Sequence, residues 1–433
     1  MEQMHDPHSS KSMVVNLINP KQVATPLQVG LLTWALPPEK SGLSRAALEI
    51  AHAIGEAGAD VRVFTLDRSH REQEGDIEII GCAPGDRLAE MRRRPAIGHL
   101  AAPLAFRQAV MAEHRRRPFD VIEATNWYAP GAAIAAAGAI PLVTRNSTPA
   151  AISLAQEPSL RNWVDRKAAT LIEKIAARRS AGLISNTAPH GMMIAKLYGV
   201  PAPGPRHAVI GLSLPQMITR RGQNARYPAD GPIELLFVGR NEPRKGFDAV
   251  LGALKVLSAD VAAGRLAPFR MTLVGAEDVD VAALPAQVRV HLRLFHRVGE
   301  QALHDLFEQA HIVVAPSRYE SFGLVYQEAM MFGRPIVGCA EDASARLFVG
   351  QSGAGILART CDGEAVAAAL RSLMIDRTLR EHHAAASRAA SGQFTRRTLG
   401  EQTLAAYRSA IGSKRRSSRT SSSNRAPEVD IAE

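Results

Sequence analysis

The chain has 433 residues, of which 46% are apolar and 22% charged, and its formal net charge is +10. This length suits two domains better than one core, and the apolar fraction excludes a chain that is disordered throughout. The positive charge favours anionic partners such as nucleic acid, lipid head groups or phosphorylated substrates. Cys82, Cys339 and Cys361 are far apart, which excludes a disulfide framework and a cysteine-rich zinc site.

No secretion signal is visible near the N-terminus, and no apolar run approaches the length of a membrane span. We therefore expect a cytoplasmic protein that can also be peripheral on the inner face of the cell membrane. Three arginine clusters, at residues 92–94, 115–117 and 178–179, make an anionic membrane surface a candidate partner. Their alternative role is solubility at helix ends.

Residues 1–26 are polar and mixed in composition, and we expect them to be unordered. Short β-rich runs then alternate with Ala-rich helical runs, which is typical of a parallel sheet with right-handed crossovers. The expected strands cover residues 27–33, 61–65, 119–124, 141–144, 181–185 and 207–210, with a long helix at 42–56. Together they predict a first domain over residues 27–221.

A polar segment rich in Gly and Pro, residues 222–232, predicts a linker, after which the alternation restarts. The expected strands are 233–238, 269–274, 288–292, 311–315 and 335–338, and the expected helices are 247–258, 301–309, 324–332 and two within 362–390. A second domain over 233–392 follows. A last helix at 393–411 should cross back onto the first domain, before an unordered basic tail at 412–433. The fold class is α/β, with two Rossmann-like doubly wound domains facing across a cleft that holds the ligand.

Basic residues follow the first strand of the second domain. Gly239 permits a tight exit from the strand, and Arg240, Arg244 and Lys245 come just before the next helix. Cations at the carboxyl end of a strand, beside a helix N-terminus, suit a diphosphate. For this loop alone, a solvated basic loop is an equally good interpretation.

A second motif, at residues 320–328, surrounds the start of a later helix. Gly323 permits a sharp turn, and the amides of Phe322, Gly323 and Leu324 can point out of the helix start towards phosphate or sugar oxygens. Glu320 precedes the helix, and Glu328 lies about two turns into it. Two glutamates at this spacing, taken alone, are more often a capping acid and a solvent-facing side chain.

Together, these motifs resemble those of family 4 retaining glycosyltransferases (glycosyl transferases group 1), which have the GT-B fold. The resemblance covers residues 233–360 and rests on GRNEPRKG (239–246), FHRV (295–298), SRYESFGLVYQEAMMFGRPIV (317–337) and GQSGAGIL (350–357). It implies that Arg240 and Lys245 bind the donor diphosphate and stabilise the leaving nucleotide, and that Glu328 binds the ribose. The catalytic residues that it implies are Arg240, Lys245 and Glu320.

The same resemblance assigns further contacts to the donor. Glu320 would contact the donor sugar, and the loop at Arg297 and Val298 would face the nucleobase. The remaining donor-binding residues that it implies are Gly42, Gly239, Ser321, Phe322, Gly323 and Leu324.

The first domain departs from the family pattern. Ser41 replaces the first of two adjacent glycines that commonly precede the first long helix, leaving Gly42 as the second. Asn126 and Asn146 stand where the family often has His, and we expect them to contact the acceptor. Arg346 replaces an expected Glu.

The resemblance implies a metal-independent hexosyltransferase that uses a UDP- or GDP-sugar and no cofactor. The expected acceptor is a glycan or lipid-linked sugar of exopolysaccharide or cell-envelope synthesis. A DxD pattern at residues 278–280 is interpreted as a solvated loop rather than a metal site. The alternatives are a nucleotide-sugar epimerase, a phosphorylase-like enzyme and a non-catalytic anionic-ligand binder; nucleic acid is not the expected partner.

Overall fold

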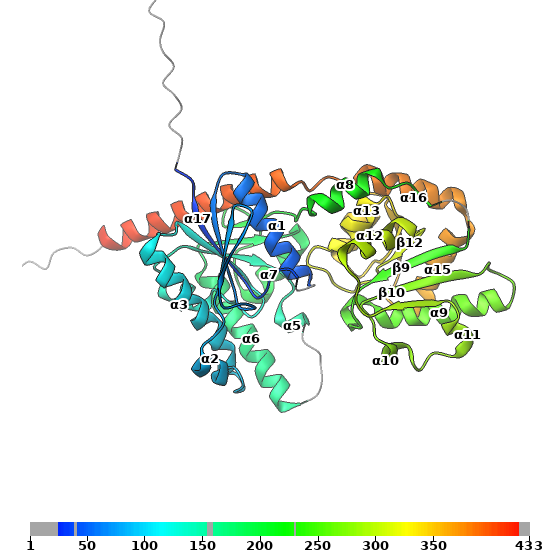
Figure 1. The fold of residues 1–433 in the computed structure, drawn as a ribbon, viewed down its shortest axis with the longest axis horizontal. Helices are drawn as coiled ribbons and strands as arrows, with labels where there is room; N and C mark the ends of the chain where they lie inside the picture. Colours follow the sequence, from blue (N-terminus) through cyan, green and yellow to red (C-terminus); the bar gives the residue numbers. More distant parts are fainter. Residues whose placement is uncertain (1–24, 39–40, 154–158, 229–230, 424–433) are drawn as a thin grey trace, which may run out of the picture.

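The computed structural model describes residues 25–38, 41–153, 159–228 and 231–423, and the side chains of these up to 416. Two α/β domains lie side by side, each built around one sheet, and the long helix α17 (Arg396–Ser423) runs along the first domain (Figure 1). The expected unordered stretch 1–26 lies outside the described residues, apart from its last two.

The first domain contains an eight-stranded sheet in the order β3-β4-β2-β1-β5-β6-β7-β8. Neighbouring strands are parallel except for the antiparallel β3–β4 pair. The strands are β1 (Gln28–Thr33), β2 (Asp60–Thr65), β3 (Arg71–Glu74), β4 (Ile77–Gly81), β5 (Val121–Thr125), β6 (Leu142–Asn146), β7 (Gly182–Ser185) and β8 (His207–Val209).

Helices cover the faces of this sheet. They are α1 (Gly42–Glu56), α2 (Asp86–Met91), η1 (Ile97–Leu100), α3 (Ala101–Arg116), α4 (Ala132–Ala137), α5 (Ala150–Ser153), α6 (Leu160–Arg179) and α7 (Ala188–Tyr198). The next helix, α8 (Gln216–Asn224), packs against the second domain, where Arg221 bonds to Glu308. Helix α1 begins where the sequence predicts because Ser41 and Ser44 form a reciprocal capping box. Its buried face, which includes Ala47 and Ile50, packs onto the sheet.

The second domain contains six parallel strands in the order β11-β10-β9-β12-β13-β14. The strands are β9 (Ile233–Val238), β10 (Phe269–Val274), β11 (Leu292–Phe295), β12 (Ile312–Val314), β13 (Ile336–Cys339) and β14 (Gly355–Ala358). The helices are η2 (Pro243–Lys245), α9 (Phe247–Ala262), α10 (Asp278–Val281), α11 (Ala286–Arg289), α12 (Glu300–Gln309), α13 (Leu324–Met331), α14 (Ala343–Ala345), η3 (Arg346–Gly350), α15 (Gly363–Ile375) and α16 (Arg377–Ala390).

Three expected elements differ from the structure. Residues 288–292 are not a strand: α11 ends at Arg289, and the strand β11 starts only at Leu292. Pro285 starts this short helix, and the apolar run alone could not distinguish helix from strand. The expected linker begins inside α8, which continues to Asn224.

The expected unordered tail starts too early, because α17 continues past residue 411 to Ser423. This helix is anchored on the first domain: Arg396 Nη2 lies 2.5 Å from Glu49 Oε2, and Tyr407 donates to Glu123 at 2.7 Å. Once tertiary contacts hold a helix, adding one residue costs little, and the Lys and Arg residues beyond 411 are good helix formers.

Candidate active site

The loop after β9 is held against the loop that precedes α13. Gly246 has a φ of 69°, and a Cβ atom there would lie 2.1 Å from the Pro316 carbonyl oxygen. Only glycine permits this approach. It places Lys245 and Glu320, which are 75 residues apart in sequence, in contact.

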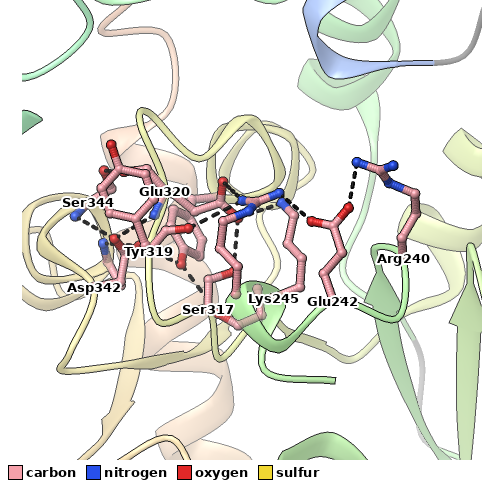
Figure 2. A network of polar contacts seen from close by, with 12 residues as sticks. Arg240, Glu242, Lys245, Ser317, Tyr319, Glu320, Asp342 and Ser344 are labelled. Carbon is pink, nitrogen blue, oxygen red and sulfur yellow. Dashed lines mark hydrogen bonds and ion pairs between the residues drawn. The ribbon is translucent and has the colours of Figure 1, made fainter. Parts of the chain in front are cut away.

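Glu320 is the centre of the cluster that results (Figure 2). Lys245 Nζ donates to its Oε1 at 2.5 Å, and Ser317 Oγ donates to the same oxygen at 2.9 Å. Arg244 Nη1 donates to Oε2 at 3.2 Å. Glu320 is only 8% exposed, so it is not a solvated capping acid.

The charges around Glu320 determine its protonation. Burial raises the pKa of Glu320, but the charges of Lys245 and Arg244 and the hydrogen bonds from Lys245 and Ser317 lower it more, so the pKa lies below its usual value. Glu320 therefore stays ionised at neutral pH. An ionised carboxylate accepts hydrogen bonds from sugar hydroxyls.

A second buried carboxylate, Asp342, supports this loop. It accepts from the Glu320 backbone N–H at 3.0 Å and from the Tyr326 hydroxyl at 2.9 Å, and it caps α14 through Ser344 and Ala345. Burial, followed by the charge of Glu320, raises the pKa of Asp342 to about 6. The sequence analysis missed this residue, although an Asp before a short Ala/Ser-rich segment is a helix-cap signal.

Arg240 is placed differently from the other cations. Its side chain is 79% exposed, and its Nη2 lies 2.5 Å from Glu242 Oε1 (Figure 2). Arg244, which is not among the expected catalytic residues, instead joins the Glu320 cluster. The motif thus provides two partly buried cations, at 244 and 245, and one exposed cation, at 240.

The start of α13 lies next to this cluster. Gly323 has a φ of 88°, which turns the chain sharply into the helix. Phe322 is buried against Phe348 and Phe394, so only its backbone can face a ligand. Ser321 and Leu324 are half-buried. The first-turn amides of a helix have no partners within that helix, which suits oxygen atoms of a phosphate.

Glu328 joins the two domains. It is 3% exposed, and Arg45 Nη1 of α1 donates to its Oε1 at 2.8 Å. Gly42, at the start of α1, lies so close to Leu324 of α13 that a side chain there would come into contact with it. The predicted donor-binding residues 42 and 328 are therefore at the same interdomain boundary. Arg45 was not predicted, because nothing in the sequence pairs it with a residue 283 positions away.

His190 and Tyr319 form a second bond between the domains. His190 Nδ1 lies 2.8 Å from the hydroxyl of Tyr319, the residue that directly precedes Glu320. Burial lowers the pKa of His190 to about 4, so the ring is neutral at neutral pH. The sequence analysis gave no role to either residue.

The remaining predicted donor residues lie at the carboxyl ends of strands in the second domain. Gly239 directly follows β9, and Arg297 and Val298 follow β11. The Asp278–Asp280 pattern is not the expected solvated loop: it starts the short helix α10, where Asp280 accepts from the Glu277 N–H at 2.7 Å and from Asn241 at 2.8 Å. Asp280 therefore caps this turn.

The two predicted acceptor residues are buried in the first domain. Asn126 donates to the Tyr198 hydroxyl at 3.0 Å and accepts from the Ser147 N–H at 2.6 Å. Asn146 donates to the Ile184 carbonyl at 3.0 Å, while its Oδ1 has no partner among the described residues. The side chain of Asn126 is thus used in internal hydrogen bonds. Asn146 and Asn186 line a small cavity beneath α1, and the buried side-chain oxygen of each has no hydrogen-bond partner among the described residues.

The described part of the chain contains neither a cluster of metal ligands nor a membrane-spanning helix. No group of three or more His, Cys, Asp or Glu side chains there is arranged to hold a metal ion. None of the helices in that part combines the length and apolarity needed to cross a bilayer.

Two parallel-sheet domains with cations and a helix start at their boundary define a GT-B glycosyltransferase that depends on a nucleotide sugar. Family models match both domains: "Glycosyl transferase 4-like domain" over residues 41–211 and "Glycosyl transferases group 1" over residues 221–390. The chain belongs to this glycosyltransferase family, which confirms the family and fold expected from the motifs.

Curated relatives and solved structures agree with this assignment. The chain is 27% identical over 377 residues to D-inositol 3-phosphate glycosyltransferase of Xylanimonas cellulosilytica, covering 82% of this chain and 88% of the relative. It is also 27% identical to glycogen synthase of Mycobacterium tuberculosis strain H37Rv, covering 88% and 94%.

Two solved structures share the fold. Sucrose-phosphate synthase from Thermosynechococcus elongatus has a TM-score of 0.66 at 20% identity, covering 89% of this chain and 99% of that one. Anabaena HepE in complex with UDP and glucose has a TM-score of 0.61 at 18% identity, covering 87% and 98%.

Proposed function

We propose that this glycosyltransferase transfers a hexose, with retention of anomeric configuration, from a UDP- or GDP-sugar to a glycan or lipid-linked acceptor. Exopolysaccharide or cell-envelope synthesis is the proposed setting. The observation that carries this proposal is the Lys245–Glu320 pair, in the loop before α13, the helix whose Glu328 bonds to Arg45 of the first domain. HepE, whose structure contains UDP and glucose, supports a uridine nucleotide.

In this proposal, the donor diphosphate binds between Lys245, Arg240 and the amides at the start of α13. The exposed Arg240 side chain rotates away from Glu242 to reach the phosphate oxygens, where a guanidinium can donate two hydrogen bonds. Glu328 binds the ribose: Arg45 occupies its Oε1, which leaves Oε2 to accept from a hydroxyl. The loop at Arg297 and Val298 faces the base through its backbone.

Departure of the nucleoside diphosphate develops negative charge on its bridging oxygen. Fixed cations and helix amides stabilise such charge at little reorganisation cost. We propose that Lys245 and Arg240 provide this stabilisation without a metal ion. The departing phosphate then accepts the proton of the acceptor hydroxyl on the same face of the sugar, and retention follows. Glu320, kept ionised by Lys245 and Arg244, orients a hydroxyl of the donor sugar.

The acceptor is proposed to approach from the first domain. Asn146 and Asn186 have buried oxygens without a partner among the described residues, at the carboxyl ends of β6 and β7. A buried acceptor that is left unpaired costs free energy, so a ligand hydroxyl that donates to it is favoured. Arg145 also lines this cavity, but it is paired with Glu123 at 2.8 Å, so the acceptor hydroxyls are proposed to be uncharged.

The competing proposals are a nucleotide-sugar epimerase and a non-catalytic anionic-ligand binder. The partial burial of Lys245 and Arg244 around Glu320 favours a small ligand at the domain boundary over nucleic acid, which needs an open basic stripe.

A screen of UDP-, GDP- and ADP-hexoses tests the proposal, with thermal shift and release of nucleoside diphosphate as readouts. We expect one UDP- or GDP-sugar to raise the Tm and to be slowly hydrolysed. Binding without any nucleotide release in the presence of acceptor sugars would favour the non-catalytic binder, and release of an epimerised nucleotide sugar would favour the epimerase.

A further inference from the structure

Helix α6 exposes apolar side chains to solvent. Leu160, Trp163, Leu171 and Ile175 are 79%, 51%, 56% and 39% exposed. Trp163, Leu171 and Ile175 lie at intervals of eight and four residues, with Lys167 between the first two, so they share the outward half of the helix. The side chains that bury α6 against the domain are instead small or internally bonded. An outward apolar stripe is the reverse of the pattern of a surface helix in a soluble domain.

The neighbouring turn η1 adds to this stripe. Ile97 and Leu100 are 48% and 42% exposed, and Leu104, at the start of α3, is 39% exposed. Asp165 of α6 accepts from the Ala96 N–H at 2.8 Å, which fixes η1 against α6. We call these seven side chains, with the basic residues beside them, the α6–η1 surface. Among the described residues, seven of the thirteen exposed large apolar side chains belong to it.

Basic residues surround the apolar side chains of this surface. Lys167 is exposed and lies 5.8 Å from the Trp163 ring centre, and Arg92, Arg93 and Arg94 are exposed just before η1. The acids of α6 point elsewhere: Asp165 faces η1, and Glu173 is buried. Helix α2 has two exposed acids, Asp86 and Glu90, of which Glu90 pairs with Arg94 at 3.6 Å.

The three arginine clusters of the sequence are therefore not equivalent. In the cluster at 115–117, Arg116 pairs with Glu113 at 3.3 Å and Arg117 with Glu78 at 2.7 Å. Those at 92–94 and 178–179 accompany the exposed apolar residues of η1 and α6. Figure 1 shows α6 and α2 together on the side of the first domain away from α17, with the N-terminal end of α6 projecting from the domain.

We propose that the α6–η1 surface docks this protein on an anionic lipid bilayer. Apolar side chains flanked by Lys and Arg, with a tryptophan among them, match the interface between lipid head groups and acyl chains. A second copy of the chain is a poorer occupant, because docking by the same surface would bring Lys167 and Arg92–Arg94 of both copies together. The proposal concerns a surface apart from the donor site and does not depend on the proposed reaction.

Sedimentation of the full chain with vesicles tests the proposal. We expect pelleting with phosphatidylcholine vesicles that contain phosphatidylglycerol, and much less with phosphatidylcholine alone. The double variant Leu171→Glu/Ile175→Glu should lower the partition coefficient by about tenfold or more, since each change removes apolar area and adds repulsion. Lys167→Glu should lower it on anionic vesicles, and added salt should weaken all electrostatic binding.

Matched controls distinguish binding through this surface from nonspecific electrostatic or hydrophobic binding. Val279→Glu/Val290→Glu changes two side chains of the second domain that are 74% and 76% exposed, and Arg115→Glu changes an exposed arginine outside the surface. Both should bind vesicles nearly as the parent does. Trp163 emission should shift to the blue with vesicles, and the shift should vanish in Trp163→Phe, because Trp34 and Trp127 are half-buried.

Three outcomes would overturn the proposal. One is equal partitioning of the parent to neutral and anionic vesicles, or none to either. Another is an equal loss of binding in the surface and control variants. The third is a concentration-dependent dimer, measured by light scattering without lipid, that Leu171→Glu/Ile175→Glu abolishes; this would assign the surface to a second copy. Unchanged thermal unfolding of the variants shows that the fold is retained.

Discussion

Two buried carboxylates, one in each domain, have opposite environments. Glu320 lies between Lys245 and Arg244, and the pKa of its carboxyl group is lowered. Glu173 accepts only from neutral donors, the Tyr198 hydroxyl at 2.7 Å and the N–H groups of Tyr128 and Ala150. Burial accordingly raises the pKa of Glu173 to about 7. Fixed cations of the second domain thus surround Glu320, whereas the first domain contributes Arg45, which is paired with Glu328, and uncharged groups around Asn126 and Asn146.

The two environments indicate different roles for the two domains in the proposed reaction. A leaving group that becomes more negative needs fixed cations, and these lie on the donor side. Acceptor hydroxyls need only hydrogen-bonding groups, which amides provide. Changes to the charged cluster should therefore affect catalysis, and changes to the Glu173 network should affect stability and its pH dependence.

The largest effect is expected for Lys245→Met. Loss of the cation removes charge stabilisation from the proposed leaving group and leaves Glu320 with one cation fewer. We expect kcat/KM to fall by about 10²–10³-fold, together with a loss of about 1–3 kcal/mol of unfolding free energy. Lys255→Met, on the exposed side of α9, is the control. Unchanged kinetics in Lys245→Met would exclude this residue from the site.

Arg240→Ala distinguishes an effect on catalysis from an effect on stability, because Arg240 is exposed and does not pair with a buried acid. We expect kcat/KM to fall by about 10²-fold, with the Tm unchanged. Steady-state kinetics and thermal unfolding on the same samples check this. A large loss of stability with normal kinetics would contradict the role proposed for Arg240.

Glu173→Gln tests the network of neutral hydrogen-bond donors around Glu173 in the first domain. Because the pKa of about 7 in the folded protein lies above the usual 4.5, the folded state binds more protons between these values, and Glu173 makes the protein less stable as the pH rises. Relative to the parent, the variant should gain about 2 kcal/mol of unfolding free energy between pH 5 and pH 7. Urea unfolding at several pH values measures this difference. Parallel curves would show that Glu173 does not titrate in this range.

The smallest effects are expected for Glu328→Gln and for its partner variant Arg45→Gln. Glu328→Gln keeps the shape of the side chain but weakens its bonds to Arg45 and to the proposed ribose hydroxyls. We expect the KM for the donor to rise by about tenfold, with kcat nearly unchanged. Arg45→Gln should produce a smaller rise, since it acts by orienting Glu328. A fall in kcat alone would place Glu328 at the reacting sugar instead.

Much of the fold could be predicted from the sequence, because buried parallel strands leave continuous apolar runs. The expected strands at 233–238 and 269–274 coincide with β9 and β10. The strand predicted at 288–292 was wrong, because a short apolar segment after a proline fits a helix and a strand equally well. The hairpin of β3 and β4 was missed because β3, Arg-Glu-Gln-Glu, has no apolar residue to mark it.

The candidate site was predictable only as separate motifs. The cations at 240–245 and the glutamates at 320 and 328 were visible, and the structure buries both glutamates. Which cation meets Glu320 depends on the turn at Gly246, so Arg244 could not be separated from Arg240 in advance. Arg45 and His190 act across long separations that local pattern does not encode, whereas Asp342 carried a local helix-cap signal that was overlooked.

Binding of nucleoside diphosphates tests the central claim most directly. The claim is that Lys245 binds the diphosphate and Glu328 the ribose. Calorimetry would compare UDP, or GDP if the screen favours it, with its 2′,3′-dideoxy analogue in the parent, Lys245→Met and Glu328→Gln. We predict that Lys245→Met weakens both ligands alike, and that Glu328→Gln weakens only the ligand that has both hydroxyls. Equal affinity of all three proteins for both ligands would contradict the account.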